Sequence, residues 1–97
     1  MKIAEGDSVF KALHRFVAEV DPPVIPPGKS RTVDVAIKGV EVGDAVMAIP
    51  PPYLGEGIGF VGCRVTADDI VTIGLDNHNK NATQPVTDSW FFIIVPK

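Results

Sequence analysis

The chain of 97 residues contains a single cysteine, Cys63, and therefore cannot form an internal disulfide. Aromatic residues make up only 7% of it, with one tryptophan and one tyrosine. Nine Lys and Arg stand against twelve Asp and Glu, and the formal net charge of −3 provides no basic stripe for a nucleic-acid backbone. The apolar runs stop far short of the roughly 20 residues that a membrane-spanning helix requires. We therefore expect no nucleic-acid partner and no membrane partner.

Side chains that perform catalysis or bind metal are also scarce. Neither His14 nor His78 has a serine or cysteine placed beside it by local spacing, so a catalytic triad has no support. Cys63 lies in an apolar run without a neighbouring cysteine or histidine, which is typical of a small buried residue. The loop 76–85 contains alternating asparagines, but a calcium loop requires early carboxylates and a glycine at its sharp turn. We expect no enzymatic activity, no metal site and no cofactor.

The residues that are present indicate one small β domain. Apolar residues make up 45% of the chain, and nine glycines and nine prolines separate short apolar runs. Alternating and apolar segments predict strands at 30–38, 45–49, 58–66, 70–75 and 90–95. A tight turn at 66–69 joins two of them into a β-hairpin. With a further strand ending at Asp21, this pattern predicts an all-β fold, a small β-sandwich of the jelly-roll or Ig-like kind.

The stretch 39–50 lies at the centre of this predicted organisation. Gly39 and Gly43 supply the backbone freedom that turns require, and a short buried strand follows them. Pro50 to Pro52 then stop that strand, because proline has no N–H to donate to a ladder. We expect the residues before this stretch to form one half of the sandwich and the residues after it to form the other half.

The N-terminal segment 1–20 is predicted to be an arm or short helix that leads into the first strand, with the β-sandwich domain spanning 21–97. Apolar side chains at helical spacing favour the helix, and these are Val9, Phe10, Leu13, Phe16 and Val17. A competing interpretation starts a strand near His14, which would place Phe16, Ala18 and Val20 on one face. Such an arm would be free to pack on a neighbouring subunit.

Two apolar features predict an interface with another chain. The strand 90–95 is apolar on both sides, so one face fills the core and the other must be covered by another segment or subunit. Tyr53 and Leu54 lie in a loop, where they either cover the end of the core or are displayed for a partner. The predicted interface residues are Val9, Phe10, Leu13, Phe16, Tyr53, Leu54, Trp90 and Phe92.

A series of short motifs runs from Asp21 to Val95 and covers most of the chain. They begin with Asp21-Pro22, Gly39-Val40-Glu41-Val42-Gly43-Asp44-Ala45-Val46 and Pro50-Pro51 followed by a glycine-containing loop. They continue with Gly62-Cys63-Arg64-Val65-Thr66-Ala67-Asp68-Asp69-Ile70-Val71-Thr72-Ile73, Asn77 and the closing strand at Trp90. This order and spacing resembles that of small structural proteins of tailed bacteriophages.

The resemblance implies a capsid decoration (cement) protein that binds the major capsid protein on the surface of the virion and stabilises the phage head. It further implies a homo-oligomer, a homo-trimer with a dimer as the alternative, and brings no catalytic residues with it. A second hypothesis is a head or tail fibre or receptor-binding module, in which Tyr53 or Trp90 lines a groove for a surface glycan or protein. A third, ranked last, is a small enzyme or metal-dependent domain around His78.

Overall fold

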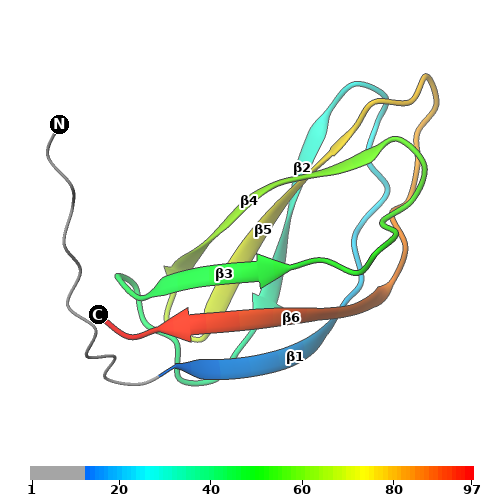
Figure 1. Ribbon diagram of the computed structural model, residues 1–97. Helices are drawn as coiled ribbons and strands as arrows, with labels where there is room; N and C mark the ends of the chain where they lie inside the picture. The colour runs from blue at the N-terminus through cyan, green and yellow to red at the C-terminus, as the bar shows by residue number, and fades with distance from the viewer. Residues whose placement is uncertain (1–12) are drawn as a thin grey trace, which may run out of the picture.

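The structure of the chain is a computed structural model that describes residues 13–97, and these residues form six strands. The strands are β1 (His14–Val20), β2 (Ser30–Ala36), β3 (Ala45–Ile49), β4 (Ile58–Ala67), β5 (Ile70–Asn77) and β6 (Asp88–Val95). They pair into two antiparallel sheets with the orders β1-β6-β3 and β2-β5-β4, packed face to face (Figure 1). The predicted all-β fold, a small β-sandwich, is confirmed. Among the described residues, no helix is long and apolar enough to span a membrane.

The core lies between the two sheets because alternate side chains of each strand point inward. Trp90 and Phe92 of the central strand β6 are fully buried, as are Ile73 and Leu75 of the central strand β5. Phe60 of β4 meets Trp90 edge to face, with the ring centroids 5.3 Å apart. Such an aromatic pair contributes about 0.5–1.5 kcal/mol beyond the area it buries, and here it joins one sheet to the other.

β4 and β5 form the predicted hairpin, which turns at Asp68 and Asp69. Asp69 has a φ of +66°, a left-handed conformation that aspartate adopts more readily than most residues. Its N–H donates to the Val40 carbonyl at 2.9 Å and its own carbonyl accepts from the Ile37 N–H at 2.9 Å. Its carboxylate accepts from the Gly39 N–H at 2.7 Å. The hairpin turn therefore holds the turn that follows β2.

The N-terminal prediction requires a correction. β1 pairs antiparallel with β6, from His14 opposite Ile94 to Val20 opposite Asp88. The favoured helix is therefore wrong from His14 onward, and the competing strand that begins near His14 is confirmed. His14–Val20 is a strand of the sandwich rather than part of an arm that precedes it. Val9 and Phe10 lie outside the described residues.

The expected division of the sandwich at 39–50 is also wrong. β1 and β2 belong to different sheets, and β3 pairs with β6 rather than with a strand near it in sequence. The chain changes sheets four times, in the proline-rich connector 21–29 and in the segments 37–44, 50–57 and 78–87. Each sheet is thus assembled from both halves of the chain.

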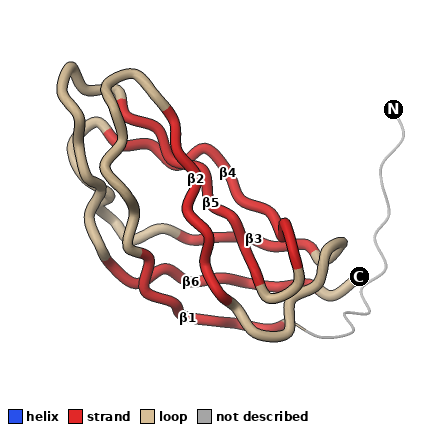
Figure 2. The backbone as a smooth tube through the Cα atoms, turned by 180° about the vertical axis from the view of Figure 1, so that it is seen from behind, coloured by secondary structure: helices blue, strands red, loops and turns tan. Residues whose placement is uncertain are grey.

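Three long segments, 21–29, 50–57 and 78–87, gather at one end of the sandwich, which we call the loop end (Figure 2). Ile25 and Thr83 exchange two main-chain hydrogen bonds of 2.8 and 3.0 Å, and the Val86 N–H donates to the Leu54 carbonyl at 2.9 Å. The opposite end, which we call the open end, contains the beginning of β1 and the C-terminus (Figure 1).

Candidate functional site

The sheet β1-β6-β3 carries an apolar surface on the side that faces away from the core. Its register places Val17 and Ile49 on either side of Phe91, and Met47 beside Ile93. Val17 is 58% exposed and Met47 is 60% exposed, although both are apolar. We call this surface the outer face and define it as Val17, Met47, Ile49, Phe91, Ile93 and Val95. Contiguous exposed apolar surfaces of this kind mark binding sites for other molecules.

Two charged side chains flank Val17 on the same side of β1. Arg15 and Glu19 alternate with the inward-pointing Phe16 and Ala18 and therefore share the outer face with Val17. The Arg15 guanidinium carbon lies 4.8 Å from the centroid of the Phe91 ring. This cation–π contact, worth about 0.5–1 kcal/mol at an exposed site, keeps a positive charge beside the apolar surface.

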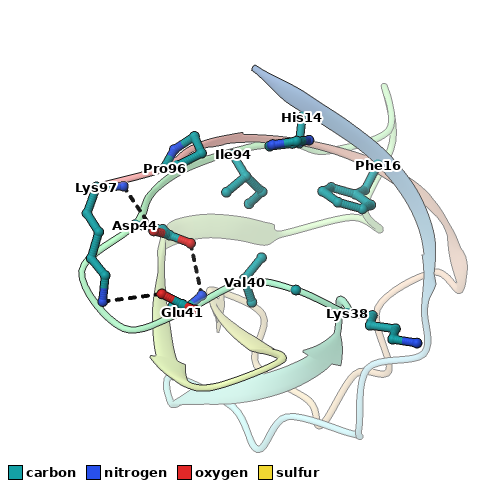
Figure 3. A pocket seen from close by; sticks show the side chains of 10 residues that line it. His14, Phe16, Lys38, Val40, Glu41, Asp44, Ile94, Pro96 and Lys97 are labelled. Atoms are coloured by element: carbon teal, nitrogen blue, oxygen red, sulfur yellow. Dashed lines mark hydrogen bonds and ion pairs between the residues drawn. The ribbon is translucent and has the colours of Figure 1, made fainter. Parts of the chain in front are cut away.

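The open end contains a cavity of about 370 Å³ between the sheet β1-β6-β3 and the segment 37–44. Phe16 and Ile94 lie on one side of it and Val40 on the other, and these three side chains form the apolar part of its wall (Figure 3). Charged groups form its rim, where the Lys97 ammonium lies 3.5 Å from the Glu41 carboxylate. Because both of these side chains are more than half exposed, this ion pair contributes little to stability.

Asp44 is the anchor of this rim. Its carboxylate accepts from the Glu41 N–H at 2.9 Å and from the Lys97 N–H at 3.1 Å (Figure 3). These two main-chain hydrogen bonds favour the ionised form, so the pKa of Asp44 is lowered from its ordinary value of 3.8. These hydrogen bonds join the turn before β3 to the C-terminal residue Lys97. Asp44 therefore has a structural role in this turn.

The loop end is organised around Asn77, a buried polar residue. Its side-chain amide donates to the carbonyls of Ile25 at 2.9 Å and Asn81 at 3.0 Å, and its oxygen accepts from the Asn79 N–H at 2.8 Å. Both N–H donors and the oxygen of this buried amide therefore have partners within the fold. The alternating asparagines therefore tie three segments together through hydrogen bonds.

His78 follows Asn77 and is largely exposed. Its Nε2 atom lies 3.0 Å from Oδ2 of Asp76, the other oxygen of which is buried. Among residues 13–97, no group of three His, Cys, Asp or Glu side chains lies close enough to hold a metal ion.

A shallow depression of about 480 Å³ lies beside the loop end, at the exposed Tyr53. Its lining combines this one aromatic ring with polar groups from Glu56, Asn79, Asn81 and Gln84. Asn79 is held in place, because its amide donates to the Glu56 carbonyl at 2.6 Å. An exposed ring beside fixed amides and a carboxylate can stack on and hydrogen-bond to a polar ring such as a sugar.

Cys63 of β4 is half-buried beside β3. Its sulfur lies 3.8 Å from the Val46 carbonyl, and burial raises the pKa of its thiol. A raised pKa reduces the thiolate fraction, which is the reactive form. The interpretation of Cys63 as a small packed residue therefore agrees with its surroundings.

Two predicted interface residues are wrongly assigned. Trp90 and Phe92 are fully buried in the core and present no surface to a partner. The prediction that β6 has one core face and one uncovered face is nevertheless confirmed. The face that contains Trp90 and Phe92 points into the core, and the uncovered side chains are those of the opposite face, Phe91, Ile93 and Val95.

The remaining predicted interface residues divide by exposure. Leu13 and Tyr53 are 56% and 62% exposed, and both are available to a partner. Phe16 and Leu54 are half-buried and pack against the core, so Leu54 covers the end of the core while Tyr53 points outward. Sequence reasoning missed Met47 and Ile49, which the alternation of β3 places on the same side as Phe91.

Comparison with known protein families, curated proteins and solved structures found no match for this chain. The resemblance to phage structural proteins thus stays a prediction that depends on the motifs alone.

Proposed function

We propose that this chain is a virion structural protein, a capsid decoration (cement) protein that docks as a homo-oligomer on the major capsid protein. The observation that carries this proposal is the outer face. It presents six apolar side chains from three neighbouring strands of a rigid sheet, at a place where nothing else in the described chain covers them.

The outer face lies on one side of an open sheet, which suits a broad protein surface better than a small ligand. Small molecules bind in concave pockets that enclose most of their surface, whereas the outer face is built on one side of an open sheet. A cement protein stabilises a shell by burying area against the shell proteins, and apolar side chains in the centre of a contact supply most of that free energy. The motif order that resembles phage structural proteins supplies the proposed partner.

Docking can be tested by sedimentation with capsids that were assembled without this protein. We expect the wild-type chain to pellet with such capsids and Met47→Asp to remain in the supernatant, because a charge in the docked face would be desolvated without a partner. Val61→Asp is the matched control, since Val61 is 64% exposed on β4 of the other sheet. Equal pelleting of both variants would refute docking through the outer face.

A fibre or receptor-binding module is the second candidate, and the depression at Tyr53 favours it. In that case Tyr53 would stack on a sugar ring while Asn79 and Gln84 bind its hydroxyl groups. A glycan array with wild-type protein and Tyr53→Ala separates this function from docking. Binding to a glycan that Tyr53→Ala abolishes, without any binding to capsids, would favour the second candidate.

A further inference from the structure

β1 is an edge strand with a free side. It pairs with β6 alone, and within the part of the chain that the structure describes no strand pairs with its other edge. An unpaired edge presents a row of N–H and C=O groups that can accept a strand from another molecule. β1 is seven residues long, and the proline Pro22 follows its end after Asp21.

The edges β3 and β4 are less suited to such pairing. β4 contains irregularities in its register at Phe60/Gly62 and at Val65/Ala67, and bulges of this kind twist an edge away from a new partner. β3 has five residues and is followed by three prolines from Pro50. β2 is a regular edge, but its charged residues Arg31 and Asp34 are not placed symmetrically about any residue of the strand.

The charges of β1 are arranged symmetrically about Val17. In an antiparallel pair of two identical strands related by a two-fold axis at Val17, each residue n positions before Val17 lies opposite the residue n positions after it. Arg15 then lies opposite Glu19 of the partner subunit, and Glu19 opposite Arg15 of the partner subunit. Directly opposite residues share a face of the sheet, so both pairs fall on the side of the outer face.

No other two-fold register of β1 gives this result. Directly opposite residues point to the same face of the sheet, and along one strand only residues an even number of positions apart share a face. The two-fold axis must therefore pass through a residue and not through the peptide bond between two residues. An axis at Arg15 or Glu19 would bring like charges together, and an axis at Phe16 would leave both charges opposite neutral residues. An axis at Ala18 would place Glu19 opposite Val17 and Arg15 opposite Asp21, which lies beyond the end of the strand. Only the axis at Val17 also pairs all seven residues of the strand.

We propose that two copies of this chain associate through β1, antiparallel and centred on Val17, into a continuous six-stranded sheet. This inference deepens the proposed function and rests on its homo-oligomer, for which it specifies a two-fold dimer. On the inner side of the pair, Phe16 lies opposite Ala18 of the partner subunit, a large residue against a small one. The two outer faces lie side by side in one sheet, which doubles the surface that can dock on a shell.

The contact between Arg15 and Phe91 is compatible with this pairing. A guanidinium uses its flat face to stack on an aromatic ring and its edge to donate hydrogen bonds to a carboxylate. Arg15 can therefore keep its position over Phe91 while its edge meets Glu19 of the partner subunit. Phe91 would then hold the arginine in place before association.

Charge reversal tests the register. Sedimentation velocity of the full chain across a range of concentrations should show a monomer–dimer equilibrium. Arg15→Glu and Glu19→Arg each place like charges opposite one another and should raise the dissociation constant by about tenfold to a hundredfold. An equimolar mixture of these two variants should recover dimers, because each then meets the opposite charge, and the double reversal R15E/E19R should recover them as well.

A wild-type chain that is monomeric at every concentration, or a trimer, would overturn the inference. So would single variants that dimerise as the wild type does, or a mixture that fails to recover dimers while both variants unfold like the wild type in urea. The docking proposal is tested separately, because Met47 lies on β3, away from β1. Dimerisation of Met47→Asp without capsid binding would support both proposals. Capsid binding by a monomeric chain would remove this inference and the homo-oligomer, and it would leave docking through the outer face in place.

Discussion

Replacement of Asn77 by alanine should destabilise the protein strongly, although the residue contributes no apolar side chain to the core. The substitution removes two hydrogen bonds that the amide donates and one that its oxygen accepts. The Ile25 carbonyl loses one of its two hydrogen bonds and keeps the Thr83 N–H as a partner, so this loss costs about 0.5–1.5 kcal/mol. The Asn81 and Asn79 groups are closer to solvent and lose about 0.5–1 kcal/mol each. The expected total is about 1.5–3.5 kcal/mol.

The assay is urea unfolding followed by the fluorescence of Trp90, the only tryptophan, which is fully buried. For a small domain with an m-value of about 1–3 kcal/mol/M, Asn77→Ala should lower the urea midpoint by about 1 M or more. Asn81→Ala is the matched control, because Asn81 enters the network through its main-chain carbonyl. A loss below about 1 kcal/mol for Asn77→Ala, or an equal loss for Asn81→Ala, would refute this account of the loop end.

Three further predictions concern other parts of the molecule. Phe92→Ala should cost about 3–5 kcal/mol and Phe91→Ala about 1 kcal/mol or less in the same assay, because only Phe92 fills the core; equal losses would contradict the assigned faces of β6. Because the pKa of Asp44 is lowered in the folded state, its ionised carboxylate stabilises the fold above pH 3.8, and this stabilisation is lost as the pH falls through the folded pKa. Asp44→Asn should therefore be less stable than the wild type at pH 7, and the difference in stability between the two should narrow in acid. Since burial raises the pKa of the Cys63 thiol, Ellman's reagent should react with it many-fold more slowly in the native protein than in concentrated guanidinium chloride, and equal rates would show that the thiol is open.

The strands away from the N-terminus could be predicted because their side chains alternate within short, well-bounded segments. The predicted strand 45–49 coincides with β3, and the hairpin of β4 and β5 follows directly from the turn at Asp68 and Asp69. β1 was ambiguous because its apolar residues satisfy the helical and the strand period together. Pairing with β6, at the other end of the sequence, decides between them.

The candidate site was only partly predictable for a related reason. The sequence of 90–95 indicates a strand with two apolar sides, but it contains no information about which side faces the core. The prediction places Trp90 and Phe92 in an interface, whereas both side chains fill the space between the sheets. The outer face depends on the order β1-β6-β3, which brings Val17 and Met47 into one surface from distant parts of the chain.

The central claim is that the outer face docks on a protein shell, and Met47 provides a direct reporter of it. Its thioether is exposed in the free chain and can be oxidised by hydrogen peroxide to the sulfoxide. The measurement is the rate of Met47 oxidation, by mass spectrometry of its peptide, in the free chain and in the chain pelleted with capsids assembled without it. The account predicts oxidation that is several-fold slower on the capsid, and an unchanged rate in the bound chain would contradict it.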